Sequence, residues 1–230
     1  MARPRQPILS RDLIVTTALD LIDRTGRFTI PELAHRLQVS VSSLYHHVAG
    51  RADIVEGIRG RLVALMTMPT EPDWQDAVVH WATSYRDAFA AHPAAIPLLV
   101  GQTVSDPATL AQYDQLAEVL HERAGLTGDD LVVAITMLDT LCLGAALDLG
   151  APSEVWAVDR DSMLTRSLGG TPHAELSRTA FDRQLRLIVA DLARHPRVDL
   201  ASGAGSTDDR APAPRGRSRA SRLTGEHTVT

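Results

Sequence analysis

The feature that most restricts the fold of this chain is residues 29–48, which are typical of two short helices joined by a tight corner. Thr29 is a favourable N-cap, and Pro31 fits the first turn of a helix because its missing N–H would have no intrahelical partner there. Leu33 and Leu37 lie four residues apart and form the apolar stripe of a short helix. The pattern predicts the first half of a helix-turn-helix pair.

The second helix of the pair begins after Ser40, a capping residue, and Gln38 and Val39 make the turn before it. Leu44 and Val48 share one face and can anchor this helix to the first. The outward positions are Val41, Ser42, Ser43, Tyr45 and His47. Small hydroxyls and an aromatic ring on the outer side of a pinned short helix are typical of a helix that enters a DNA major groove. The alternative is a plain packing corner without DNA contact.

Charge is distributed unevenly along the 230 residues. Residues 1–68 carry nine Arg against six acidic residues, whereas residues 69–198 carry nine Arg against eighteen acidic residues. A basic N-terminal module on an acidic body favours DNA binding, because phosphate attraction is local and the acidic bulk repels DNA elsewhere. The single cysteine, Cys142, excludes an internal disulfide and fits a reducing cytosol, so we expect a cytoplasmic protein.

The helix-turn-helix pair has predicted helices on both sides. Residues 1–9 are predicted to form a flexible basic arm. Ser10 caps a first helix that ends near Gly26, which completes a three-helix DNA-binding domain over residues 10–50. A connecting helix is predicted over residues 51–68.

The rest of the chain shows no sustained strand alternation, so the predicted fold class is all-α. The predicted helices span residues 73–91, 106–124, 127–149 and 172–195, with one short helix around 156–164. Pairing the 127–149 and 172–195 helices with their symmetry mates would form a four-helix bundle, so we expect a homodimer. The alternative is that both are core helices of a monomer. Residues 199–230 have the composition of a disordered tail.

The sequence lacks the usual patterns of enzymes and membrane proteins. The longest apolar run, residues 131–149, contains Asp139 and Asp148, so we expect no membrane span. There is no His-Glu-x-x-His zinc pattern, no Gly-x-Ser-x-Gly nucleophile turn and no glycine-rich phosphate loop. The nine His residues are scattered along the chain. We therefore expect a protein that is not an enzyme and has no metal and no cofactor.

The order of these features resembles the TetR family of bacterial repressors. The resemblance rests on Leu33-Ala34, Leu37-Gln38-Val39, Ser43-Leu44-Tyr45, His47-Val48 and Arg51. It continues more weakly through Trp74-Gln75-Asp76, Tyr85-Arg86, Gln112-Tyr113 and Leu143-Gly144, and covers residues 8–150. It implies an N-terminal three-helix DNA-binding domain with a helix-turn-helix, followed by a C-terminal helical ligand-binding and dimerisation domain over residues 69–198.

The resemblance also implies which residues contact DNA. They are Thr29, Pro31, Val41, Ser42, Ser43, Tyr45, His47 and Arg51. The three that follow the capping Ser40 match base-reading positions, and the last three match phosphate contacts, which hold register without reading sequence. Packing of Tyr45 and His47 against the first helix is the alternative. The implied partner is a palindromic double-stranded DNA operator, bound by a dimer whose recognition helices lie about 34–36 Å apart.

A small-molecule effector in the C-terminal domain is implied as well. The matching positions are Trp81, Tyr85, Leu99, Gln102 and Val119, to which Asp139 and Cys142 could add polar contacts. Trp81 and Tyr85 are four residues apart and could form a flat apolar wall of a pocket, or simply pack in the core. Leu99 stands where the family's magnesium-chelating pattern has His, so a magnesium-bound effector is not expected. The expected effector is small and largely apolar or aromatic.

These expectations combine into a ligand-responsive DNA-binding transcriptional regulator, a repressor by family default, that the effector releases from its operator. The alternative is a helical small-molecule binding or scaffold protein without operator binding. A salt-dependent affinity for DNA would separate the two, because a packing corner has no reason to release counterions from DNA.

Overall fold

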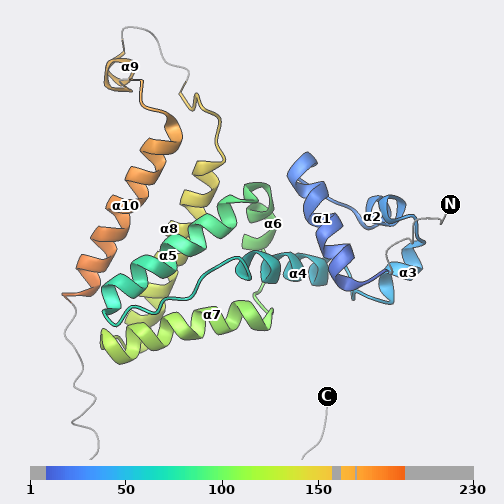
Figure 1. The fold of residues 1–230 in the computed structure, drawn as a ribbon, viewed down its shortest axis with the longest axis horizontal. Helices are drawn as coiled ribbons and strands as arrows, with labels where there is room; N and C mark the ends of the chain where they lie inside the picture. Colours follow the sequence, from blue (N-terminus) through green and yellow to red (C-terminus); the bar gives the residue numbers. More distant parts are fainter. Residues whose placement is uncertain (1–8, 157–161, 169, 195–230) are drawn as a thin grey trace, which may run out of the picture. The chain divides into compact units, whose positions relative to one another are not determined.

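The computed structural model describes residues 9–156, 162–168 and 170–194, which lie within one compact unit, residues 1–198. Within these residues every regular element is helical, so the all-α prediction is confirmed (Figure 1). The α-helices are α1 (Arg11–Thr25), α2 (Ile30–Leu37), α3 (Val41–Tyr45), α4 (Arg51–Val63), α5 (Trp74–Ala90), α6 (Ile96–Val100), α7 (Pro107–Glu118), α8 (Gly128–Leu149), α9 (Met163–Leu168) and α10 (His173–Leu192). The predicted arm and tail fall almost entirely outside the described residues.

The first three helices form a small domain, which we call the head (residues 10–50). Ile14, Leu33 and Leu44, one from each helix, are fully buried in its core. Ser10 caps α1 by accepting a hydrogen bond from a backbone N–H. Gly26 ends α1 with φ 74°, a left-handed conformation that glycine adopts without strain. The predicted bounds of the first helix are confirmed.

The corner between α2 and α3 is built by local hydrogen bonds. The Thr29 hydroxyl accepts from the Glu32 N–H at 3.3 Å and donates to the Glu32 carboxylate at 2.8 Å, which satisfies the start of α2. Gln38 makes the turn with φ 57°, and Ser40 caps α3. Regular α3 ends at Tyr45, and the chain continues as a turn before α4.

α4 connects the head to the remaining helices, which we call the body (residues 69–194). The helix was predicted to run to residue 68, but it ends at Val63. Pro69 and Pro72 lack N–H donors and cannot continue a helix across this segment. The Thr67 N–H instead donates to the Ser84 hydroxyl at 2.7 Å, which fixes the segment on α5.

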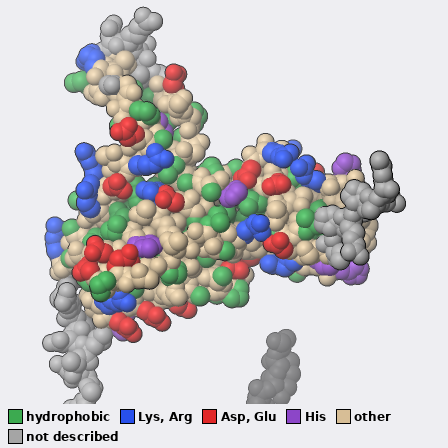
Figure 2. All heavy atoms as spheres, in the orientation of Figure 1, with side chains coloured by type: hydrophobic (Ala, Val, Ile, Leu, Met, Phe, Trp, Pro, Cys, Tyr) green, Lys and Arg blue, Asp and Glu red, His purple; other side chains and the backbone are tan. Residues whose placement is uncertain are grey.

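The body is organised around α8, which packs against α5 and against α10 (Figure 1). Its buried residues are Ala134, Leu138, Cys142 and Ala146, every fourth position of one face. α7 packs against both α4 and α8. In the view of Figure 2, acidic side chains gather along the lower edge of the body, where α7 lies. The body helices agree with the predicted ranges to within a few residues.

Two predictions about local structure need correction. The short helix expected around residues 156–164 is α9, Met163–Leu168, because the Ser162 hydroxyl caps the helix by accepting from the Thr165 N–H at 3.0 Å. Residues 157–161 lie outside the described residues. The helix predicted over 106–124 is α7 followed by one π-helical turn, Val119–Arg123.

Candidate DNA-binding and ligand-binding sites

The outer face of α3 is exposed as the sequence predicts. Leu44 and Val48 are buried, whereas Tyr45 is 54% exposed and Val41 is 38% exposed. His47 and Ser42 are also exposed, and Ser43 is half-buried. Packing of Tyr45 and His47 into the head is therefore not what the structure shows. This face is available to a partner, and its contact with DNA stays a prediction.

The serine hydroxyls at the start of α3 are positioned by the cap. The Ser40 hydroxyl lies 2.9 Å from the Ser42 hydroxyl and 2.8 Å from the Ser43 hydroxyl. The same Ser40 oxygen accepts the Ser43 N–H at 3.1 Å. A hydroxyl has one donor and two acceptor sites, so Ser40 is fully used, whereas the Ser42 and Ser43 hydroxyls keep capacity for further hydrogen bonds. The cluster can present oriented donors or acceptors to base edges.

The remaining predicted DNA contacts lie beside this helix. Thr29 and Pro31 are exposed at the start of α2. Arg51 has a structural role that the sequence did not predict, because its Nη1 donates to the Phe28 carbonyl at 3.0 Å. Its guanidinium also lies 4.3 Å from the centre of the Phe28 ring. These contacts tie the start of α4 to the segment before α2 and leave further N–H donors of Arg51 for a phosphate.

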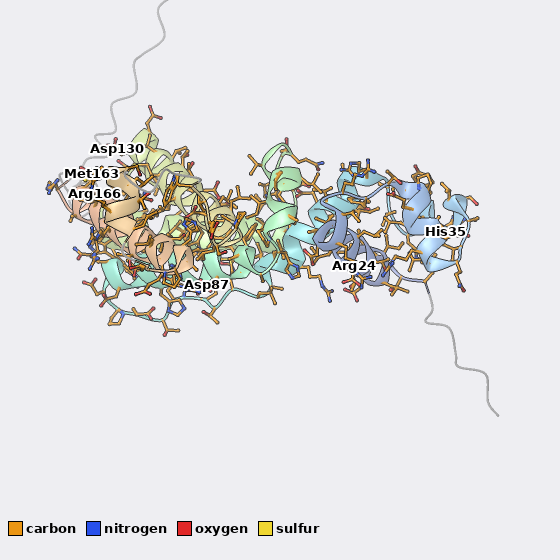
Figure 3. All side chains as sticks on the ribbon, turned by 90° about the horizontal axis from the view of Figure 1, so that it is seen from above. Arg24, His35, Asp87, Asp130, Met163 and Arg166 are labelled. Atoms are coloured by element: carbon orange, nitrogen blue, oxygen red, sulfur yellow. The ribbon has the colours of Figure 1, made fainter. Side chains whose placement is uncertain are left out.

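Figure 3 shows His35 on the outer side of the head, on α2. Together with the exposed α3 residues it places several polar and aromatic side chains on one end of the three-helix domain. The head thus combines a buried apolar face and an outward polar face on helices of only eight and five residues.

Three of the predicted effector-binding residues come together in the body. The rings of Trp81 and Tyr85 on α5 have centroids 5.0 Å apart. The Tyr85 hydroxyl donates to Asp139 Oδ1 on α8 at 2.8 Å. Tyr113 on α7 donates to the same oxygen, and its ring centroid lies 6.2 Å from that of Trp81. We call Trp81, Tyr85, Tyr113 and Asp139 the tyrosine–aspartate cluster.

Both phenols of the cluster are donors. Burial, followed by the negative charge of Asp139 and the hydrogen bonds to it, raises the pKa of Tyr113 above its ordinary value of 10.0. Burial also raises the pKa of Tyr85, and the neighbouring Tyr113 and Asp139 reinforce the shift. Neither hydroxyl loses its proton at neutral pH, so Asp139 acts as the acceptor. The sequence pattern did not indicate Tyr113 as a ligand-binding residue, although Gln112-Tyr113 is part of the family resemblance.

The other predicted effector residues are dispersed. Leu99 and Cys142 are buried, and Val119 is half-buried at the start of the π-helical turn. The Cys142 thiol donates to the Ala82 carbonyl at 3.3 Å, and burial raises its pKa, so it is an inert core residue. Gln102 lines a separate groove of about 580 Å³ beside Glu56 and Asp106. Among the described residues, no group of His, Cys, Asp or Glu side chains has the arrangement of a metal site.

A buried ion pair joins α4 to the body. Arg59 Nε donates to Glu56 Oε1 at 2.9 Å, and Arg59 Nη2 donates to the Leu99 carbonyl at 2.7 Å. Glu56 Oε2 accepts the backbone N–H groups of Ser105 at 2.7 Å and Asp106 at 3.0 Å. Burial alone would raise the pKa of Glu56, but these hydrogen bonds and the charge of Arg59 outweigh it and lower the pKa.

α4 is equally attached to the head. Arg11 on α1 pairs with Asp53 at 2.7 Å, and Arg61 pairs with Asp12 at 2.7 Å. Helix α4 therefore bonds to α1 on one side and to the α6–α7 connection on the other. α1 also contacts the body directly, because His92 Nδ1 lies 2.8 Å from Asp23 Oδ2.

An apolar groove of about 900 Å³ runs along α8 and α10. Val132, Val133 and Leu187, all on its walls, are each more than half exposed. α8 is also long and apolar enough to cross a membrane by length and composition. However, its Asp139 is hydrogen-bonded within the body, and its exposed Val132 and Val133 line the groove shared with α10.

The sequence was compared with known proteins. Residues 68–189 match the profile of the tetracycline repressor-like C-terminal domain. A helix-turn-helix transcriptional regulator of Saccharopolyspora erythraea is 28% identical over 166 residues, which cover 70% of this chain and 68% of that protein. The transcriptional repressor DrrR1 of Streptomyces coeruleorubidus is 23% identical over 150 residues, 63% of this chain and 55% of that protein.

Solved structures share the fold at low sequence identity. ActR of Streptomyces coelicolor, in complex with actinorhodin, superposes with a TM-score of 0.65 at 20% identity, covering 81% of this chain and 99% of that chain. BioQ, bound to its natural double-stranded DNA operator, superposes with a TM-score of 0.61 at 21% identity, again over 81% and 99%. These likenesses confirm the arrangement of head and body helices.

Proposed function

The chain belongs to the family of tetracycline repressor-like transcriptional regulators, and on this basis we propose that it binds a palindromic operator as a homodimer and releases it when a small molecule occupies the body. Membership makes it a ligand-responsive DNA-binding regulator. The protein acts as a repressor in the cytoplasm, without metal, cofactor or catalytic step.

The proposal rests mainly on α3, which has one buried face and one exposed face. Leu44 of α3 and Val48 of the segment after it are buried and fix the helix on the head, whereas Tyr45, His47 and the serine cluster lie on the outer side. A residue such as Tyr45 with 54% exposure contributes little to the core. BioQ, whose structure contains operator DNA, has the same fold. The serine hydroxyls would read base edges, and Tyr45, His47 and Arg51 would contact phosphates.

The groove along α8 and α10 supports the homodimer. Burying the exposed Val132, Val133 and Leu187 against a second copy removes apolar surface from water, which is the main driving force of association. A two-fold axis along these helices would build the four-helix bundle that the sequence predicts. The dimer presents two α3 helices to one face of DNA, which accounts for a palindromic site.

Release follows from a population shift. A ligand that binds better to a state in which the two heads cannot enter successive major grooves favours that state by its difference in affinity. The buried Glu56–Arg59 pair supplies the physical link, since it bonds α4 to the α6–α7 connection. ActR, whose fold is similar, was solved in complex with actinorhodin, which supports a small-molecule ligand for this chain.

The proposal is tested by fluorescence anisotropy of the full chain on labelled DNA from the region beside its own gene, with scrambled DNA of equal composition as the control. We expect tight binding to the specific DNA at two protomers per site, with an affinity that falls steeply as salt rises because phosphate contacts release counterions. The contrary result is equal weak binding to both DNAs and to every other genomic segment tested. It would mean that the chain is a helical small-molecule binding or scaffold protein.

A further inference from the structure

Asp139 of α8 is a half-buried carboxylate that forms no ion pair with the described residues. It accepts two phenol hydroxyls on Oδ1, and within the described residues its Oδ2 has no hydrogen bond and the residue has no ion pair. The two buried arginines of this region are occupied elsewhere. Arg59 pairs with Glu56, and Arg86 pairs with Asp87. The carboxylate therefore keeps a free acceptor oxygen and an unpaired negative charge.

Two aromatic residues reach this half-buried carboxylate with their hydroxyl groups, and a third ring packs against both of them. Trp81 and Tyr85 come from α5, and Tyr113 comes from α7. Trp81 contacts both tyrosine rings, with centroid distances of 5.0 and 6.2 Å. Ring faces carry partial negative charge and attract cations, most strongly in a desolvated site. A carboxylate among three such rings attracts positive charge and repels negative charge.

Two further polar atoms on the same helices lack partners. Trp81 Nε1 on α5 and Gln112 Oε1 on α7 are buried, and neither has a hydrogen-bond partner in the described part of the chain. Trp81 itself is 1% exposed. Leaving a buried polar atom without a partner is unfavourable, so such atoms favour the binding of a molecule that completes their hydrogen bonds. Gln112 Oε1 and Asp139 Oδ2 accept hydrogen bonds and favour a ligand that donates them, whereas the Trp81 Nε1–H donates and favours an acceptor or a π-face on the same ligand.

We propose that the ligand of this protein is a lipophilic cation, an aromatic or apolar molecule bearing a protonated amine, whose ammonium group binds Asp139 within the tyrosine–aspartate cluster. This inference rests on the proposed function, because it names the chemical class of the small molecule that the body recognises. The ammonium group donates to Asp139 Oδ2, its charge lies against the aromatic rings, and the apolar part of the molecule packs on Trp81.

The position of the cluster explains how such a ligand would reach the head. Tyr113 lies on α7, and the residues just before α7, Ser105 and Asp106, hold Glu56 of α4. A ligand bound to Asp139 Oδ2 changes the position of this carboxylate, which Tyr113 holds through Oδ1, and so shifts Tyr113 and α7. The shift is then passed to α4 through the Glu56–Arg59 pair, without any contact between ligand and head.

The test is isothermal titration calorimetry of the full chain, without DNA, against matched probes. The probes are arylmethylammonium ions from benzyl through naphthyl to anthracenyl, each paired with its uncharged alcohol and its carboxylate. We expect at least one ammonium ion to bind about tenfold or more tighter than its alcohol, since charged hydrogen bonds contribute about 1.5–3 kcal/mol. The carboxylates should not bind.

Asp139→Asn should remove the preference for the ammonium ion over the alcohol. The control is Asp130→Asn, which removes an exposed charge from the first turn of the same helix (Figure 3) and should leave the preference intact. Equal binding of ammonium ion and alcohol to the wild-type chain, or binding of neither at any ring size, would overturn the proposal even if Asp139→Asn failed to fold. Because no DNA is present, this outcome is separate from failure of operator binding.

Discussion

Leu44 and Tyr45 are neighbours in the chain with opposite environments, and the difference assigns their roles. Leu44 is fully buried, whereas Tyr45 is 54% exposed on the outer face of α3. Truncation of the first creates a cavity in the head, which costs about 2–5 kcal/mol. Truncation of Tyr45 removes only a side chain that projects into solvent. Stability and DNA affinity should therefore separate between these two adjacent positions.

Tyr45→Ala is expected to abolish operator affinity and to change the free energy of unfolding by less than about 0.5 kcal/mol, as for surface substitutions in general. Anisotropy on operator DNA and thermal melting measure the two effects. Leu44→Ala is the matched control and should lower the melting temperature clearly. A melt of Tyr45→Ala as low as that of Leu44→Ala would show that the ring is part of the core.

Glu56 links α4 to the residues before α7, and the stability that this link contributes should depend on pH. Its folded-state pKa is lowered from the ordinary value of 4.5. A lowered pKa means that the contribution to stability is fully present above 4.5 and is lost as the pH falls through the folded-state pKa. Glu56→Gln should be less stable at pH 7 by about 1–3 kcal/mol. Urea unfolding at pH 7 and in acid should show that the variant loses less stability on acidification, and an unchanged pH dependence would contradict this role.

At the scale of the element, α4 is confined by close packing on both sides. Gly60 faces the body, where a Cβ would lie 2.6 Å from Asp106 Oδ1. Asp106 cannot move freely, because its Oδ2 caps α7 by accepting the Thr109 N–H and hydroxyl, both at 2.9 Å. A methyl group at residue 60 would thus disturb the cap of another helix. The small residue allows α4 and the start of α7 to touch.

Gly60→Ala is accordingly expected to destabilise the protein by about 1–3 kcal/mol through overpacking, although alanine favours an isolated helix by about 1 kcal/mol. Urea unfolding measures the change. In an Asp106→Ala background the clash is gone, so the same substitution should be neutral or stabilising. Equal destabilisation in both backgrounds would mean that the contact with Asp106 is not the cause.

The elements also show how far the sequence predicts this structure. Caps at Ser10, Thr29 and Ser40 and the exposure of Tyr45 follow from residues within one or two helical turns, and the structure confirms them. The Glu56 hydrogen bonds to Ser105 and Asp106 span 49 and 50 residues. No local pattern encodes such a contact, because it depends on how α4 and α7 are packed. The roles of Tyr113 and Arg51 were missed for the same reason.

In the whole molecule, we expect operator binding to depend on dimerisation through the apolar groove of α8 and α10. Leu187 is 71% exposed in this groove, so its replacement should not disturb the fold of one protomer. Leu187→Glu would place a charge on each side of the two-fold interface, and burying unpaired charges is costly. Assembly and operator binding should therefore be lost together.

Leu187→Glu is expected to be monomeric by light scattering after size-exclusion chromatography, with a helical spectrum like that of the wild type. Its operator affinity should fall by about a hundredfold or more, because the two heads no longer act on one site. Leu110→Glu, at an exposed leucine of α7, is the control and should remain a dimer. A dimeric Leu187→Glu protein would place the interface elsewhere.

We expect the two heads of one dimer to bind the two halves of a single operator. The most direct measurement is anisotropy on the footprinted operator and on the same operator with about five base pairs inserted at its centre, which turns one half-site by about half a helical turn. If both heads bind one operator, affinity should collapse with five inserted base pairs and partly recover with about ten. Equal affinity for all three DNAs would contradict it, because each head would then bind independently of the other.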